Sequence, residues 1–361
     1  MQISEQKYFL AANSADGFIS HFGDCYIPGS WRAYIIKGGP GTGKSGFMKH
    51  LASKAADKGY AVTLCPCSSD PDSLDAVIIE DIKTVVLDGT APHTVEPQLP
   101  GACENIINTG EFWDGEKLFR NADGIAAAAK LNSRFHKTAA AYISAAGELL
   151  SDNLKLSRGF TDRAAAIRFA RRTAAKYLPL KPDRCGSEFI RFIGGVTPKG
   201  LISFSKTVTE NFKNVVIIED KYGGASGEIM QCLRAAAIKK GLDIITLKNP
   251  LLPLELTDHI LIPELSLAFV TENDHIKFNV RTRRVHARRF TFSDIAGKYK
   301  SRMLFNRKVS RELLFGAVGA LKSAKEAHDT LEKFYIDSMD FEALTRFISE
   351  TSEKILGAKA K

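Results

Sequence analysis

Short apolar runs alternate with amphipathic stretches along the chain, a pattern typical of α/β proteins. Residues 34–36 form an apolar run that predicts a buried strand. The apolar side chains of Phe47, Met48, Leu51 and Ala55 then recur at a helical period. Residues 77–79 and 85–87 predict two further buried strands, whereas the Ala-rich segment 115–177 and the segment 310–356 predict helices.

The chain also repeats itself. When the sequence is slid along itself by half its length, apolar and glycine positions of the two halves coincide, among them Phe9 with Phe192, Gly17 with Gly200, Met48 with Met230, and Leu51 with Leu233. A tandem duplication explains this agreement. We therefore expect an α/β fold of two tandem P-loop NTPase-like parallel-sheet domains, each with an appended helical arm. The predicted domains are 1–184 (core 1–112, arm 113–184) and 185–361 (core 185–297, arm 298–361).

The strongest local motif follows the strand predicted at 34–36. The stretch KGGPGTGKSG matches the phosphate-loop pattern G-x-x-x-x-G-K-[ST] between a strand and a helix. Backbone N–H groups of such a loop surround phosphates, the lysine reaches the β- and γ-phosphates, and the hydroxyl ligates Mg²⁺. The predicted nucleotide-binding residues are Gly38, Gly39, Pro40, Gly41, Thr42, Gly43, Lys44, Ser45 and Gly46.

A phosphate loop needs a carboxylate to hold the Mg²⁺ shell. Asp88 follows the strand predicted at 85–87, and Gly89 after it permits close approach to the phosphates. Glu80, after residues 77–79, is a candidate for polarising the attacking water, although an ordinary surface carboxylate is as good a reading. We therefore predict Lys44, Asp88 and Glu80 as catalytic residues, and Ser45 and Asp88 as Mg²⁺ ligands.

The repeat shows which polar residues the second half lacks. In its register Lys44 faces Ser226, and Asp88 faces Thr271; Asp70 faces Leu252, and Asp75 faces Thr257. This comparison adds Asp70, Asp72 and Asp75 as candidates for positioning water, with His93 as a weaker one. The stretch VVIIEDKYGGASGEIM then reads as a worn phosphate loop. The alternative makes Glu219 and Asp220 a Walker B pair for the Lys44 loop. We expect a single nucleotide site, in the first half.

Composition and charge bear on the location of the protein and on its partners. No apolar run has the length of a membrane span, and the start of the chain lacks a signal-peptide pattern, so we expect a cytoplasmic protein without a membrane partner. The net charge of +9 arises from segment 278–311, which holds eleven Lys or Arg residues and one acid. This segment is a possible surface for a nucleic acid or protein partner, or simply a solvated face. An arginine in 115–177 could also serve as an arginine finger.

Several motifs resemble a known family. KGGPGTGKS, CSSDPDSLD, VVLDGTAPH, GEFWD and the second-half TPKG are similar to those of a bacterial family of tandem P-loop ATPase-like proteins, common in Firmicutes, whose reaction is not established. The resemblance implies the tandem fold and ATP binding. Relatives carry a phosphate loop in both halves, and this chain departs from them at Ser226, so its second loop is degenerate.

The expected function is ATP and Mg²⁺ binding with weak or regulated ATPase activity, in which the helical arms rearrange with the nucleotide. One alternative is a kinase that acts on a small molecule or nucleotide. Another is a nucleic-acid-associated ATPase that uses segment 278–311.

Overall fold

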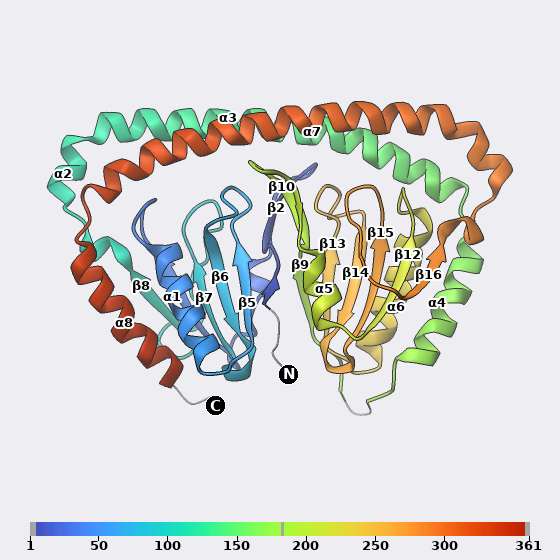
Figure 1. The fold of residues 1–361 in the computed structure, drawn as a ribbon, viewed down its shortest axis with the longest axis horizontal. Coiled ribbons are helices and arrows are strands. Elements are labelled where there is room, and N and C mark those ends of the chain that lie inside the picture. The colour runs from blue at the N-terminus through green and yellow to red at the C-terminus, as the bar shows by residue number, and fades with distance from the viewer. Residues whose placement is uncertain (1–4, 182–183, 358–361) are drawn as a thin grey trace.

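Two six-stranded sheets lie side by side beneath a pair of long helices in the computed structural model, which describes residues 5–181 and 184–357 (Figure 1). The first sheet has the order β1 (Gln6–Lys7), β5 (Val62–Pro66), β6 (Leu74–Ile79), β7 (Thr84–Asp88), β4 (Arg32–Lys37) and β8 (Glu104–Asn108). The second has the order β9 (Glu188–Arg191), β13 (Ile244–Lys248), β14 (Thr257–Ile262), β15 (Leu267–Glu272), β12 (Asn214–Glu219) and β16 (Arg283–His286).

The two sheets have equivalent strand orders and directions. In the first, β4 pairs in parallel with β7 and β8, and in the second, β12 pairs in parallel with β15 and β16. Each sheet also has an antiparallel strand, β6 or β14, bonded to both neighbours. The fold is therefore mixed α/β with two parallel-rich sheets, consistent with two tandem α/β domains. The predicted parallel-sheet domains are confirmed in part: each sheet is parallel-rich but mixed, because residues 80–83 between β6 and β7 are too few for a crossover connection.

The remaining elements repeat in the same way. Each half has a small hairpin and a helix that follows the strand with a parallel neighbour on both sides, β4 or β12. Each half also has a long helix followed by a shorter one. The hairpins are β2 (Ala11–Ser14) with β3 (Gly17–Ser20), and β10 (Gly194–Thr197) with β11 (Gly200–Ser203). The α-helices are α1 (Lys44–Asp57), α2 (Gly115–Arg120), α3 (Ala122–Gly159), α4 (Arg163–Tyr177), α5 (Ser205–Asn211), α6 (Gly224–Lys239), α7 (Ser293–Ile336) and α8 (Phe341–Gly357). The short 3₁₀ helices are η1 (Phe22–Asp24), η2 (Glu80–Ile82), η3 (Thr109–Phe112), η4 (Pro263–Leu265) and η5 (Ala287–Phe290).

The two halves meet around an approximate two-fold axis. Phe9 and Phe192, which coincide in the sequence repeat, exchange both backbone hydrogen bonds, at 2.8 and 2.9 Å. Both rings are fully buried. Equivalent residues that bond to each other in this way place the symmetry axis between them.

The helical arms are exchanged between the halves. Helix α3 (38 residues) runs from the first core to the second, and α7 (44 residues) runs back beside it (Figure 1). Helix α4 then packs on the second core, where Phe169 joins Ile229, and α8 packs on the first core, where Ile355 joins Leu51. The sequence boundaries assigned each arm to the half that precedes it. In the structure, the last helix of each arm covers the other half.

Matching backbone hydrogen bonds join the last helix of each arm to the segment just before the other arm. The Asp162 amide donates to the Phe290 carbonyl and the Asp340 amide to the Phe112 carbonyl, each at 2.7 Å. The side chain of Asp162 also caps α4 through the Ala165 amide, and that of Asp340 accepts from the Ala343 amide in the first turn of α8. One sequence offset therefore relates the two arms, and it pairs Asp162 with Asp340.

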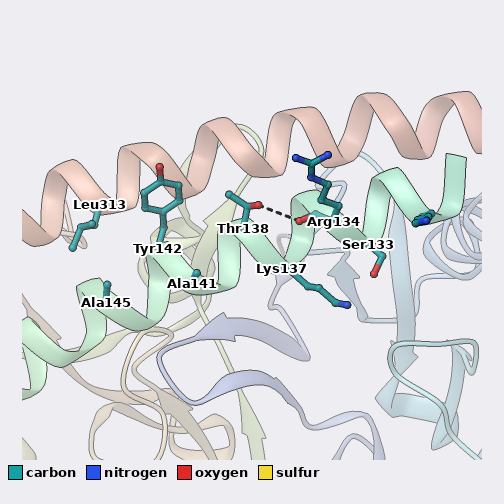
Figure 2. A pocket seen from close by; sticks show the side chains of 9 residues that line it. Ser133, Arg134, Lys137, Thr138, Ala141, Tyr142, Ala145 and Leu313 are labelled. Atoms are coloured by element: carbon teal, nitrogen blue, oxygen red, sulfur yellow. Dashed lines mark hydrogen bonds between the residues drawn. The ribbon is translucent and has the colours of Figure 1, made fainter. Parts of the chain in front are cut away.

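The helical pair carries a groove of about 870 Å³, lined mainly by α3 (Figure 2). Its lining includes Lys130, Arg134, Lys137 and Tyr142, and the Thr138 hydroxyl donates to the Arg134 carbonyl at 3.1 Å. Figure 2 shows Arg134 and Tyr142 extending toward α7, and Lys137 pointing away from it. Positive charge on the arms is therefore not confined to segment 278–311.

Among the described residues, no helix combines the length and apolar character that crossing a membrane requires.

Candidate nucleotide site

The predicted phosphate loop lies at the carboxyl end of β4. Residues 38–43 connect β4 to α1, and Lys44, Ser45 and Gly46 form the first turn of that helix. Gly43 has φ of 80°, a left-handed conformation that side chains disfavour, and this turn aims the free amides of α1 into the loop. The Lys44 ammonium donates to the carbonyls of Gly38 (3.2 Å) and Gly39 (2.6 Å). The loop and helix N-terminus thus have the arrangement that binds anions.

Asp88 lies next to this lysine. It ends β7, the parallel neighbour of β4, and its carboxylate is 3.6 Å from the Lys44 ammonium. The two side chains are only 13% and 12% exposed, so little solvent screens their attraction. The other Asp88 oxygen accepts from the Thr90 amide (2.9 Å) and hydroxyl (2.5 Å), which fixes the carboxylate orientation. The Ser45 hydroxyl accepts from the Leu74 amide at 2.9 Å.

The arm of the second half covers the phosphate loop. A Cβ atom built on Gly39 would lie 2.5 Å from the Tyr335 ring, and one on Gly41 would lie 2.9 Å from the Glu332 carbonyl oxygen. Both contacts come from the end of α7. A Cβ on Gly43 would lie 2.6 Å from Leu344 on α8. These glycines therefore serve close packing of the arm as well as backbone conformation.

A buried acid and histidine lie behind the site. Asp75 and His93 are 6% and 8% exposed, and the His93 Nε2 atom is 3.7 Å from an Asp75 oxygen. Burial, and then the charge of Asp88, raise the pKa of Asp75 to about 8. Burial is also the main cause that lowers the pKa of His93 below its usual value. At neutral pH both groups are therefore largely uncharged.

The second half does retain a counterpart of Asp75, which the sequence comparison missed. The β5–β6 and β13–β14 pairs have the same irregularity in register. When the two sheets are compared through it, the residue equivalent to Asp75 is Asp258 rather than Thr257. Burial likewise raises the pKa of Asp258 to about 7. The prediction that Asp75 has no counterpart in the second half is wrong, because the loop between β13 and β14 is one residue longer than the loop between β5 and β6.

Three other acidic residues predicted for the site lie beside cations of the protein. Glu80 follows the antiparallel strand β6, so it lies at the edge of the sheet opposite the phosphate loop, 3.6 Å from Arg191. It therefore cannot polarise water at Lys44, and that prediction is wrong. The exposed carboxylate of Asp72 binds the Lys199 ammonium in the β10–β11 turn, at 2.6 Å. Asp70 lies 3.6 Å from Lys325 on α7.

The second-half loop has a different structure. Strand β12 belongs to the second sheet, so Glu219 and Asp220 do not serve as a Walker B pair for Lys44. Gly223 has φ of 85°, as Gly43 does at the equivalent helix start, but only residues 220–223 separate strand from helix. The loop is thus two residues shorter than residues 38–43, and α6 begins correspondingly early.

The Asp220 carboxylate lies among the backbone amides of this second loop and accepts hydrogen bonds from them. One carboxylate oxygen accepts from the amides of Tyr222 and Gly223, both at 3.1 Å, and the other from those of Ala225 and Ser226, both at 2.9 Å. A cleft of about 970 Å³ remains beside it. The protein's own carboxylate thus takes the amides that would bind a phosphate. The sequence signal for this contact is an acid directly before the glycines.

Segment 278–311 forms β16, η5 and the start of α7. Some of its cations bind acids of the protein: Arg302 lies 2.6 Å from Asp152, and Arg307 lies 2.5 Å from Asp274. Arg284 lies between Glu219 and Glu272. Part of the positive charge therefore pairs with acids of α3 and of the second half, and the role of this segment toward a nucleic acid or protein partner stays a prediction.

No family model matches the chain, and no curated protein or solved structure matches it significantly.

Proposed function

We propose that the protein binds ATP with Mg²⁺ at the loop of residues 38–45 and hydrolyses it weakly or under regulation. The observation that carries this proposal is the placement of Lys44 and Asp88. Lys44 begins α1 behind a glycine-rich loop, and Asp88 ends the adjacent parallel strand 3.6 Å away. A cation for the phosphates and a carboxylate for the Mg²⁺ shell are the groups that phosphoryl chemistry requires.

Each residue has a defined task in this proposal. The loop amides and Lys44 bind the phosphates, and on binding the ammonium exchanges the Gly38 and Gly39 carbonyls for phosphate oxygens. Ser45 and Asp88 hold the Mg²⁺ shell. The second half binds no triphosphate in its loop, because Asp220 already accepts hydrogen bonds from four backbone amides there.

The test is a calorimetric titration with MgATP, with released phosphate measured in parallel. Losing the charge-assisted contacts of Lys44 is expected to cost about 2 kcal/mol, so Lys44→Ala should bind roughly 30-fold more weakly. The matched control is Ser226→Ala, because Ser226 is the counterpart of Lys44 in the repeat. Asp88→Asn, which keeps an acceptor for Thr90, should weaken mainly the Mg²⁺-dependent part of binding.

If Lys44→Ala binds MgATP as tightly as the wild type does, the site assignment is refuted. Product analysis separates hydrolysis from the kinase alternative. Phosphate released to water supports an ATPase, whereas phosphoryl transfer to an added small molecule or nucleotide supports a kinase.

A further inference from the structure

The approximate two-fold axis allows each arm to be compared with its counterpart. Lys325 on α7 lies as far before Asp340 as Gly147 on α3 lies before Asp162. The end of α7 therefore corresponds to the end of α3. The contacts agree with this correspondence, since Glu332 packs at Gly41 of the first loop and its counterpart Leu154 packs at Gly223 of the second.

A charged stripe on α7 faces the first-half site. Residues one and two helical turns apart share a face of a helix, and Lys325, Asp329 and Glu332 are spaced in this way. The Lys325 ammonium lies 2.5 Å from an Asp329 oxygen and 3.6 Å from Asp70. His328 belongs to the same group, with its Nδ1 atom 3.8 Å from Glu332. The stripe thus extends from the phosphate loop to the acidic loop before β6.

The counterpart positions on α3 carry no charge. Gly147, Leu150, Ser151 and Leu154 correspond to Lys325, His328, Asp329 and Glu332. Leu154 packs with Leu252, the residue that faces Asp70 in the sequence repeat, and with Leu256. The ionic contact between Lys325 and Asp70 is therefore replaced by apolar packing of Leu154, and Ser151, the counterpart of Asp329, donates its hydroxyl to Glu255 at 2.6 Å.

The arm residues are charged beside the loop that has Lys44, and their counterparts are uncharged beside the loop that lacks an equivalent lysine. If the stripe served only to attach the arm, the apolar cluster would serve equally well on both sides, because burying Leu side chains stabilises packing without any desolvation of charge. At these four positions, charged side chains occur only on the side of Lys44 and Asp88, and the charged contact of α3 with the second-half loop comes from Arg158 and Glu255 instead. We therefore infer that the charged stripe interacts with a ligand bound at the Lys44 loop.

We propose that Lys325, supplied by the arm of the second half, contacts the terminal phosphate of a nucleoside triphosphate bound at the Lys44 loop. This assignment rests on the proposed function and adds a phosphate-contacting residue to it. Asp70 and Asp329 hold the ammonium in place in the structure, and the terminal phosphate replaces Asp70 as its partner on binding. Because α7 is anchored at its other end in the second half, a triphosphate would link the two halves, whereas a diphosphate would not.

The experiment compares the nonhydrolysable triphosphate AMP-PNP with ADP, both with Mg²⁺, by calorimetry on the full chain. Lys325→Ala is expected to weaken AMP-PNP binding by about tenfold or more and ADP binding by less than about threefold, since one charge-assisted contact is lost only with the triphosphate. Lys325→Arg should recover most of the affinity. The matched control is Lys322→Ala, a lysine exposed on the same helix.

Asp70→Asn distinguishes phosphate contact from simple anchoring. It removes the charge partner of Lys325 but keeps an acceptor for the Ser73 hydroxyl. If Lys325 contacts phosphate, AMP-PNP binding by Asp70→Asn stays equal or becomes tighter. If Asp70→Asn loses as much affinity as Lys325→Ala, Lys325 acts only through the loop and the assignment is overturned. Thermal melting of both variants verifies that they fold.

The variants Lys44→Ala and Lys325→Ala together distinguish an error in the role of Lys325 from an error in the nucleotide site. If Lys44→Ala weakens both nucleotides while Lys325→Ala weakens neither, the nucleotide site stands and the role of Lys325 is refuted. If Lys44→Ala leaves AMP-PNP binding unchanged, the proposed function fails and the inference fails with it.

Discussion

Removal of the Asp220 carboxylate would leave four backbone amides at the start of α6 without an acceptor. The side chain is 7% exposed, so the amides would be poorly solvated by bulk water. A hydrogen bond to a charged group contributes about 1.5–3 kcal/mol, but the four bonds share one carboxylate, and water from the adjacent cleft can partly replace them. We therefore expect Asp220→Ala to lower the free energy of unfolding by about 3 kcal/mol.

The corresponding shift in melting temperature depends on how much of the chain unfolds together. With an unfolding entropy of about 2.1 cal/mol/K per residue, 3 kcal/mol lowers Tm by about 4 °C if the whole chain unfolds as one unit, and by about 8 °C if the second half unfolds alone. Scanning calorimetry measures the shift directly. Glu219→Gln is the control, because Glu219 is the neighbouring acid and its partners are Arg284 and His286 rather than the helix amides.

Formate provides the sharper assay, since it has the size of the deleted group. It should raise the Tm of Asp220→Ala and leave the wild type and Glu219→Gln nearly unchanged, because binding to the folded state alone stabilises it. A melting temperature of Asp220→Ala within about 1 °C of wild type would show that the amides do not need the carboxylate. Equal stabilisation of all three proteins by formate would refute the view that Asp220 occupies an anion site.

Two further predictions concern buried titratable and charged groups. In the unfolded chain Asp75 ionises near pH 4, but in the folded protein its pKa is about 8, so its stabilising contribution is complete below about pH 4 and is lost as the pH rises to about 8, by at most about 1.4 kcal/mol per pH unit. Urea unfolding at pH 5 and pH 8 should therefore show a smaller loss of stability for Asp75→Asn than for wild type, and an identical pH dependence would contradict the burial argument. Arg191 is 1% exposed, its Nε and Nη1 atoms make no hydrogen bond to the described residues, and its guanidinium lies over the Tyr8 ring. Arg191→Met should consequently melt at or above the wild-type temperature while Arg191→Ala melts lower because of the cavity, and a Met variant as unstable as the Ala variant would show that the charge itself is needed.

The local chemistry of the phosphate loop was predictable because it depends on neighbours in sequence. The glycine spacing, Lys44 and Ser45 fall within one short stretch, and the apolar period after them indicates the helix. The position of Asp88 also followed from local pattern, since a buried run ends directly before it. Glu80 follows an equally good apolar run, and the prediction failed because strand direction is decided by pairing with β7 and not by the run itself.

The sequence repeat relates the two halves only to within one or two residues. It paired Asp75 with Thr257, whereas the irregular register of β13 with β14 pairs it with Asp258. A one-residue difference in loop length has little effect on an alignment of apolar positions, but it decides which side chain is buried. The role of Asp220 was missed for a similar reason, because a carboxylate acts as an acceptor only where the chain brings the amides around it.

By itself, the sequence determined the phosphate-loop motif, the duplication and the helical arms, because each depends on periodicity or spacing along the chain. Only the tertiary structure decided that each arm crosses to the other half, that Lys325 lies beside Asp70, and that Asp220 accepts from the amides of the second loop. These contacts join residues far apart in sequence, and their partners are chosen by packing around the approximate two-fold axis. No local pattern records that choice, because the same helix sequence could pack against either core.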